Sequence, residues 1–310
     1  SSEVVLEKSR FRLVFEEFLI FLINIRSYKK SENSVESSYK MIPVADTGRL
    51  IEKLPYRLTD DQLTAWHDIE ADMSGRYAMN RLIQGDVGSG KTILAILALV
   101  MTAANGHQGS MMAPTEVLAE QHFRVISEMK ERYDLPLRPV LLTGSVPAAA
   151  KREIYSKLKD GSYNVIIGTH ALIQDKAEYR DLALAVTDEQ HRFGVRQRVG
   201  LSEKGNMPHI MVMSATPIPR TLAMILYGDL QISVIKQMPA GRKSIKNTVV
   251  GPEYRDRLYQ LMIREVGLGH QVYIICPMVE ADEDNGLGLE NVKDYAKRLR
   301  SAMPDEIRIG

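Results

Sequence analysis

Residues 81–92 read Arg-Leu-Ile-Gln-Gly-Asp-Val-Gly-Ser-Gly-Lys-Thr, and this stretch decides the fold. It fits the pattern Gly-x-x-x-x-Gly-Lys-Ser/Thr, in which a tight glycine-rich loop turns its backbone N–H groups onto phosphate oxygens. An apolar segment precedes the loop, and the apolar residues 93–104 follow it before Asn105-Gly106. The sequence therefore predicts a strand, a phosphate loop and a helix that ends at Asn-Gly.

The positions of this loop have separate expected roles. Lys91 would bring its positive charge to the β- and γ-phosphates of a nucleoside triphosphate, and the hydroxyl of Thr92 would be a ligand of Mg²⁺. The N-terminal end of the following helix would favour the same anion through its dipole. The other residues expected around the phosphates are Gly85, Asp86, Val87, Gly88, Ser89 and Gly90.

A second motif, Asp188-Glu189-Gln190-His191, follows the apolar residues 182–187. Hydrolysis of a nucleoside triphosphate needs one carboxylate on Mg²⁺ and a neighbouring group that orients and deprotonates the attacking water. We assign Asp188 to the metal ion and Glu189 to the water. A solvated acidic turn is the weaker interpretation, because two carboxylates that end a buried strand are costly without a cation.

Short apolar strands alternate with helices through the middle of the chain. This pattern predicts a parallel sheet covered by helices on both faces, with its ligand at the carboxyl ends of the strands. The fold class is therefore α/β with a P-loop. Strands are expected at 110–113, 140–142, 165–167, 182–187 and 210–213, and helices at 115–132 and 151–159.

The segment that begins at Thr59 opens a helix to about Met73, and Thr59-x-x-Gln62 has the form of a capping box. Gln62 also allows a second interpretation, because an amide pairs with N7 and N6 of adenine through one acceptor and one donor. Tyr56 would then stack on the adenine ring. The spacing leaves both interpretations open.

The two ends of the chain differ from its middle. Residues 4–26 have near-helical apolar spacing and predict a helix, which is either a core helix or a strut to another domain. Residues 27–44 are rich in polar residues and predict a loosely packed linker, with the ordered body beginning near Leu50. After the hinge at 239–243, helices at 253–266 and 289–303 are expected around a strand at 271–276.

These patterns predict three parts: residues 1–49 with a helix and polar linker, 50–241 as the nucleotide-binding domain, and 242–310 as the start of a second α/β domain. The Ser-Ser start and the end at Gly310 look like cuts in a longer protein. The length of 310 residues, with 45% hydrophobic and 25% charged residues, is ordinary for a globular protein of two domains.

Composition excludes several classes of protein. The net charge of +1 shows no bulk attraction to nucleic acid, so any such contact must be local. Cys276 is the only cysteine, which excludes an internal disulfide, and none of the seven histidines has metal-ligand spacing. The apolar run 18–25 is much shorter than the ~20 residues of a membrane span. A protein of the reducing cytosol, without membrane or zinc, is expected.

The motifs together resemble those of superfamily-2 helicases, and within them the RecG family of bacterial branched-DNA helicases. The resemblance covers nearly the whole chain from Phe11. Motif I is Gly-Asp-Val-Gly-Ser-Gly-Lys-Thr at 85–92, motif Ia is Pro-Thr-Glu-Val-Leu-Ala-Glu-Gln at 114–121, motif II is Asp-Glu-Gln-His-Arg-Phe-Gly-Val at 188–195, and motif III is Ser-Ala-Thr-Pro-Ile-Pro-Arg at 214–220.

The transcription-repair coupling translocases share Arg-Phe-Gly-Val and Ile-Pro-Arg with this chain and are the competing family. Two features favour the RecG family: the form of motif Ia at Pro114 to His122, and Phe15-Glu16-Glu17 in a helix similar to the one before the RecG motor.

The resemblance implies a RecA-like domain, preceded by a linker helix and followed by an incomplete second one. The implied activity is ATP- and Mg²⁺-dependent helicase or translocase action on branched double-stranded DNA, in repair and recombination, by a monomer in the bacterial cytoplasm at the nucleoid. It implies DNA-backbone contacts at Pro114, Thr115, Thr143, Gly144, Thr169 and His170, where small hydroxyl residues and glycines suit phosphates. It also implies residues that couple hydrolysis to movement: His191, Ser214, Thr216 and Arg220.

One departure concerns the second domain. No segment after Gly241 resembles Gln-x-x-Gly-Arg-x-Gly-Arg, from which related helicases supply an arginine finger. Two alternatives therefore stay open: a nucleotide- and DNA-binding fragment with negligible turnover, and an unrelated P-loop ATPase that acts on protein.

Overall fold

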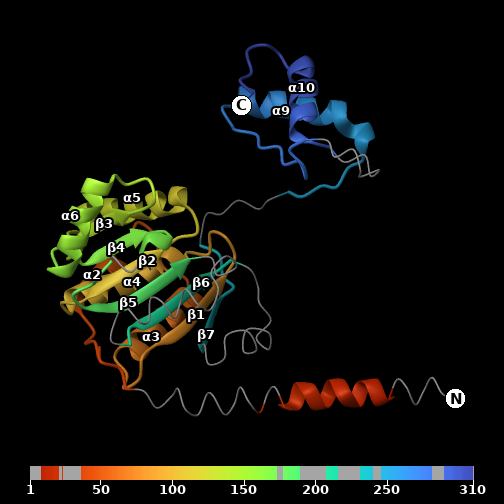
Figure 1. Ribbon diagram of the computed structural model, residues 1–310. Coiled ribbons are helices and arrows are strands. Elements are labelled where there is room, and N and C mark those ends of the chain that lie inside the picture. The colour runs from red at the N-terminus through yellow and green to blue at the C-terminus, as the bar shows by residue number, and fades with distance from the viewer. Residues whose placement is uncertain are drawn as a thin grey trace. The chain divides into compact units, whose positions relative to one another are not determined.

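The computed structural model describes residues 8–20, 23, 36–172, 177–188, 207–215, 231–239, 246–280 and 290–309. The chain divides into two compact units, unit 1 (Ser1–Arg242) and unit 2 (Lys243–Gly310). This division falls inside the predicted hinge at 239–243. The described strands all lie in unit 1, where they form one sheet (Figure 1).

All pairings in the sheet of unit 1 are parallel, in the order β3-β4-β2-β5-β6-β1-β7. The strands are β1 (Asn80–Gly85), β2 (Gln108–Met112), β3 (Pro139–Leu142), β4 (Val165–Gly168), β5 (Leu182–Asp188), β6 (His209–Ser214) and β7 (Gln231–Ile235). The α/β class and the five strands expected after the phosphate loop are confirmed, and β7 was not predicted. As an edge strand it buries few of its side chains, so it lacks a continuous apolar run.

Helices cover both faces of this sheet. They are α2 (Ala45–Lys53), α3 (Asp60–Met73), α4 (Lys91–Ala104), α5 (Glu116–Tyr133) and α6 (Ala148–Lys159). Because successive strand residues point to opposite faces, Met111 belongs to the buried cluster with α2 to α5, and Met112 to the cluster with α6. No helix among the described residues is long and apolar enough to cross a membrane.

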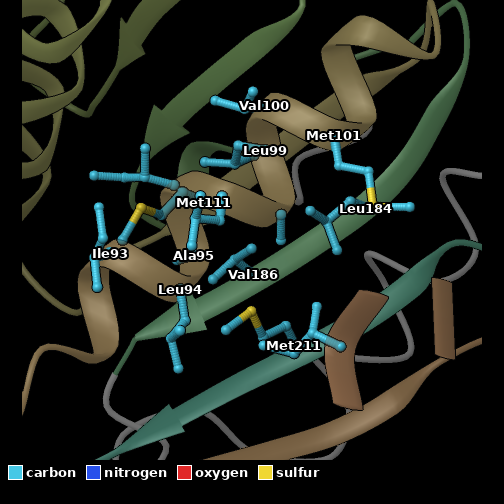
Figure 2. Packing of buried hydrophobic residues seen from close by; sticks show 14 of the residues in the cluster. Ile93, Leu94, Ala95, Leu99, Val100, Met101, Met111, Leu184, Val186 and Met211 are labelled. Atoms are coloured by element: carbon cyan, nitrogen blue, oxygen red, sulfur yellow. The ribbon is translucent and has the colours of Figure 1, made fainter. Parts of the chain in front are cut away.

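The helix α4 lies inside this core. Its residues from Ile93 to Ala103 are all buried, as expected for a helix that is apolar all round. It contacts β2 and β5 of the sheet as well as α2 and α3. Figure 2 shows its Leu94 and Leu99 in the same cluster as Val186 and Met211 of the sheet. The loop before α4 is therefore attached to a fully packed element.

A buried arginine joins α3 to the sheet. Arg81 of β1 donates from Nε to Asp72 (2.7 Å) and from Nη1 to Asp68 (3.0 Å), both on α3. Its Nη1 also donates to Oγ of Ser233 on β7, at 2.7 Å. The guanidinium is thus satisfied by two helix carboxylates and a strand hydroxyl, which makes its burial possible. It fixes the helix that carries Gln62 against β1.

The predicted loose linker at 27–44 is wrong for its described part, residues 36–44. Tyr39 and Met41 are buried in the core, and the N–H of Met41 donates to the carbonyl of Met73 at 3.0 Å. The side chain of Asn105 bonds both backbone groups of Ile42, at 2.9 Å each. The ordered body therefore begins before Leu50. Composition could not show this, because the packing depends on two apolar residues and on distant backbone partners.

Residues 8–20 are helical, in agreement with the predicted N-terminal helix. Their apolar side chains are exposed, with Phe11 at 74% and Phe15 at 57%. This exposure does not favour the interpretation as a core helix.

Unit 2 contains η3 (Pro252–Tyr254), α9 (Arg255–Gly267) and α10 (Val292–Ala302). Both predicted helices are confirmed, but the strand predicted at 271–276 is wrong. A strand needs backbone partners, and the described part of unit 2 offers only an isolated bridge between Met278 and Asn291. A hollow of about 560 Å³ lies between these elements, lined in part by Val272 and Leu299.

Candidate nucleotide-binding site

The loop between β1 and α4 has the shape that its glycines predict. Gly88 and Gly90 have φ of 79° and 83°, which residues with a Cβ rarely adopt. A Cβ on Gly90 would lie 2.2 Å from Nε2 of Gln62, and a Cβ on Gly85 would lie 2.5 Å from Oγ of Ser89. Both ends of the loop therefore need glycine, because other groups approach closely there.

The loop and the first turn of α4 gather hydrogen-bond donors. Nζ of Lys91 donates to the carbonyls of Gly85 (2.7 Å) and Asp86 (3.0 Å), so the ammonium lies over the loop. Oγ of Ser89 is buried and has no hydrogen-bond partner within the described chain. Thr92 follows Lys91 and is partly buried. An ammonium, a free hydroxyl and the N–H groups of a helix N-terminus suit phosphate oxygens, so these residues fit a triphosphate.

Gln62 connects α3 to the phosphate loop. Its Oε1 accepts from the N–H of Thr59 at 2.8 Å, and its own N–H donates to Oγ1 of Thr59 at 3.3 Å. The predicted capping box is thus confirmed. Its Nε2 donates to the carbonyl of Ser89 at 2.7 Å, and the side chain is 1% exposed. The amide therefore also holds the loop, a role that the spacing did not reveal.

The adenine roles of Gln62 and Tyr56 stay predictions. Tyr56 is 46% exposed, and burial of part of its ring raises the pKa of the phenol. An exposed aromatic face suits stacking on a base.

Asp188 ends β5, two strands from the phosphate loop. In β6, Met213 is in register with Asp188 of β5 on one side and with Ile83 of β1 on the other. Since neighbouring strands lie ~4.8 Å apart, β5 and β1 are separated by about 10 Å. Ser214, which ends β6, is buried and in register with Gln84. The three motifs therefore reach one carboxyl edge of the sheet, as the sequence predicts.

Sequence patterns assigned no role to His122, which lies against Asp188. Its Nε2 is 2.7 Å from Oδ2 of Asp188, and the two side chains are 8% and 16% exposed. On α5 it shares the buried stripe with Ala119 and Ile126. A histidine among buried positions at spacings of three and four is the signal that could have found this contact, because a buried ring needs a polar partner.

Two predicted DNA-backbone residues, Pro114 and Thr115, lie where α5 begins. Thr115 is exposed and caps α5 by accepting from the N–H of Leu118 at 3.3 Å. Oε1 of Glu116 accepts from the N–H of Ser145 at 3.2 Å. This bond ties α5 to the loop after β3, which contains two more candidate residues.

In that loop Thr143 is only 1% exposed, and its hydroxyl lies 2.9 Å from that of Ser145. Gly144 is exposed, and its carbonyl accepts from Nζ of Lys151 at 2.8 Å. The hydroxyl of Thr143 therefore shapes the loop, and Gly144 is the candidate that faces solvent.

Three further candidates complete the predicted DNA residues. Pro114 and Thr169 are partly buried, and His170 begins the short helix η1 (His170–Leu172) after β4. DNA contact at these positions stays a prediction.

Four predicted site residues lie outside the described part of the chain: Glu189, His191, Thr216 and Arg220. Their roles stay predictions. In the described ranges no three His, Cys, Asp or Glu side chains form a metal-binding group. Mg²⁺ is usually held by one or two carboxylates together with substrate phosphates. Asp188 and the hydroxyl of Thr92 are the oxygen groups on this edge that fit such an ion.

Residues 59–225 match the protein family described as DEAD/DEAH box helicase, and this span holds the phosphate loop, Asp188 and Ser214. The chain belongs to the DEAD/DEAH box helicase family. The predicted resemblance to superfamily-2 helicases is thereby confirmed.

Among curated members of this helicase group, the ATP-dependent DNA helicase RecG of Bacillus subtilis is 42% identical over 306 residues, which are 98% of this chain and 44% of that protein. RecG of Aquifex aeolicus is 42% identical over 297 residues, 95% of this chain and 37% of that protein. The chain thus spans less than half the length of these relatives.

A solved structure of RecG bound to a three-way DNA junction matches 85% of this chain and 35% of that chain, with a TM-score of 0.73 and 37% identity. The DEAD-box helicase Mss116, bound to single-stranded RNA, matches 65% of this chain and 46% of that chain, with a TM-score of 0.51 and 18% identity. The second likeness concerns the fold alone. The predicted RecA-like fold is confirmed.

Proposed function

We propose that this chain is the ATP-binding part of a DNA helicase that remodels branched DNA, such as stalled forks and Holliday junctions. The observation that carries the proposal is the shared carboxyl edge of the sheet, because β1, which leads into the phosphate loop, and β5, which ends at Asp188, lie about 10 Å apart. The similarity to RecG, 42% identical over 98% of this chain, gives the substrate class. Transcription-repair coupling is less favoured, since the relatives named above are RecG proteins.

In the proposed mechanism, the N–H groups of the phosphate loop and Lys91 hold the β- and γ-phosphates. Thr92 and Asp188 would hold Mg²⁺, and the bound ion would supply positive charge beside the phosphates. Glu189, which follows Asp188 in sequence, orients the attacking water and accepts its proton. Ser214, which ends the strand between β1 and β5, would respond to the γ-phosphate.

DNA would bind through its backbone at the start of α5 and at the loops after β3 and β4. Exposed groups there include Thr115 and Gly144. Hydroxyl and backbone N–H groups grip phosphates without reading bases, which suits a motor that moves along any sequence. In each hydrolysis cycle, arginines of a complete second motor domain would join the bound ATP and then leave it, and this opening and closing would couple hydrolysis to movement along DNA.

The proposal is tested by phosphate release at steady state, without DNA and with linear duplex, forked DNA or a Holliday junction. A longer form of the protein that includes a complete second motor domain should hydrolyse ATP fastest with the branched substrates. Equal stimulation by linear duplex would contradict the preference for branched DNA. Absence of stimulation by every DNA would favour a P-loop ATPase that acts on protein.

A second candidate function applies to the 310-residue chain by itself. No segment after Gly241 matches the arginine-finger motif, and such a finger is typically worth ~10³ to 10⁵ in turnover. We expect this chain to bind ATP with Mg²⁺, as a cytoplasmic monomer, but to hydrolyse it slowly and with little response to DNA. If the DNA-stimulated ATPase rate of this chain equalled that of the longer form with a complete second motor domain, the two-domain mechanism would be contradicted.

A further inference from the structure

The pair His122–Asp188 joins the expected metal carboxylate to α5, the helix whose first turn lies at the candidate DNA site. We propose that His122 is a positioning residue: it holds Oδ2 of Asp188 so that the other oxygen faces Mg²⁺, and α5 connects this contact to the DNA-binding loops. The inference rests on the proposed function, because it takes Asp188 as the magnesium ligand.

The geometry supports a fixed donor. Nε2 lies 2.7 Å from Oδ2, within the range of a short hydrogen bond to a charged acceptor. A carboxylate has two oxygens, so one can be held by an N–H group while the other binds a cation. Outer hydrogen bonds of this kind orient metal ligands, and their loss typically costs ~10- to 100-fold in metal affinity or activity.

The ring itself is held by packing. His122 lies on the buried stripe of α5 between Ala119 and Ile126, which belong to the main core cluster. The helix packs against β3 and β4, so its inner face has little freedom to rotate. A donor fixed in this way can determine the orientation of a carboxylate at a strand end.

The N-terminal turn of α5 reaches the candidate DNA loops. Glu116, in its first turn, accepts from the N–H of Ser145. Six residues separate Glu116 from His122, which is ~9 Å along a helix at 1.5 Å per residue. Because α5 is one continuous helix of 18 residues, it cannot rotate locally at His122, and a displacement of its first turn by the loop after β3 would reach the ring of His122 as a small shift of the whole helix.

The competing interpretation is that Asp188 merely satisfies a buried histidine, as most buried polar groups are satisfied. That role predicts a loss of stability in His122 variants without any change in the response to Mg²⁺. The positioning role predicts a specific change in the response to Mg²⁺.

The test uses the 310-residue chain and a fluorescent ATP analogue, whose affinity is measured in EDTA and across a range of MgCl₂ concentrations. His122→Ala and His122→Asn should bind like wild type in EDTA, but they should need about tenfold more Mg²⁺ for half-maximal enhancement. His122→Gln should return to within a few-fold of wild type, because the amide Nε2 of Gln reaches as far as the ring Nε2 of His and the amide Nδ2 of Asn does not.

Wild-type magnesium dependence in folded His122→Ala and His122→Asn would overturn the proposal. Should His122→Ala fail to fold, the comparison of Gln with Asn decides, and equal behaviour of the two overturns it. If Mg²⁺ has no effect on the affinity of the wild-type chain for the analogue, the assignment of the nucleotide and magnesium site is wrong.

The connection through α5 is tested by the same titration with forked DNA. DNA should shift the Mg²⁺ concentration for half-maximal enhancement in wild type and in Glu128→Ala, an exposed position on the same helix outside motif Ia. Glu116→Ala should lose at least half of that shift, because it removes the bond to Ser145. An unchanged shift in Glu116→Ala, or no shift in wild type, would overturn the connection.

Discussion

The phosphate loop and the acidic end of β5 lie on the same edge of the sheet but are held by different means. The loop is held largely by its own neighbours, since Lys91 bonds to Gly85 and Asp86 a few residues away. Asp188 is held by His122, 66 residues away on α5. The phosphate side is therefore mainly a local structure, with one bond from Gln62 of α3 to Ser89, whereas the metal side depends on the packing of a distant helix.

The largest expected effect is on the metal side, in Glu189→Gln. The amide keeps the shape of the side chain but cannot accept a proton from water, so turnover should fall by about 10²- to 10⁴-fold while nucleotide and Mg²⁺ still bind. Phosphate release by the longer form with a complete second motor domain measures turnover, and titration with a fluorescent ATP analogue measures binding. Turnover within a few-fold of wild type would show that Glu189 is not the base.

On the phosphate side, Lys91→Ala should weaken nucleotide binding by about 100-fold, since hydrogen bonds to a charged group contribute roughly 1.5–3 kcal/mol. Lys151→Ala is the matched control, because that ammonium bonds the carbonyl of Gly144 outside the phosphate loop. Unchanged affinity for the analogue in Lys91→Ala would remove the phosphate-loop assignment.

Gly90→Ala tests how strictly the local structure is set. Gly106 has a similar φ of 86°, but a Cβ added there would meet no atom within 4 Å, whereas a Cβ on Gly90 meets Gln62 at 2.2 Å. Both alanines should cost about 1–2 kcal/mol for the left-handed backbone. Only Gly90→Ala should also lower nucleotide affinity. The decrease should be about tenfold if the displaced loop loses one hydrogen bond to the nucleotide. Equal affinities in the two variants would show that the close approach is not needed.

Gln62→Ala and Tyr56→Ala separate capping from base recognition. Loss of the cap should cost about 1 kcal/mol in Gln62→Ala, while the exposed Tyr56 should have little effect on stability. If the two side chains read adenine, both variants should reduce the preference for ATP over GTP in competition binding. Lower thermal stability of Gln62→Ala with an unchanged preference would leave only the capping role.

The smallest expected effect lies away from both sides, at His209 at the start of β6. Its Nδ1 accepts from the N–H of Met79 at 2.9 Å, and its Nε2 lies 2.7 Å from the carbonyl of Tyr39, so a neutral ring is satisfied. Burial lowers the pKa of His209 below its usual range. Its contribution to stability is therefore complete above about pH 6.5, the ordinary pKa of histidine, and is lost as the pH falls.

Melting temperatures between pH 7.5 and 5.5 should consequently fall more steeply for wild type than for His209→Gln, with equal nucleotide affinities at pH 7.5. An equal fall in melting temperature for wild type and His209→Gln over this pH range would contradict the role of His209 as a neutral buried ring.

The contrast between local and distant support also explains what the sequence could predict. The cap at Thr59, the glycines of the phosphate loop and the helix end at Asn105 depend on residues a few positions apart, so pattern reasoning found them. The spacing of His122 on α5 marks it as a buried residue that needs a polar partner, but the choice of Asp188 depends on how α5 packs on the sheet, which spacing along the chain does not encode.

The wrong predictions elsewhere have the same origin. Tyr39 and Met41 lie in a polar stretch, yet they fill the core because their partners come from other parts of the chain. The apolar residues 271–276 have a strand pattern, but a strand forms only beside another strand. In each of these segments the tertiary contacts determined the structure, and the sequence pattern indicated only a local preference.

The position of β6 between β1 and β5 has one more consequence. Its backbone sets the spacing between β1, which leads into the phosphate loop, and β5, which ends at Asp188, because each strand adds a fixed hydrogen-bonding width. The distance between these two strands is thus set by the backbone and not by any side chain. We therefore expect apolar exchanges at Ile210 or Val212 to change the core around β6 without changing the distance that a triphosphate and Mg²⁺ would span in the proposed site.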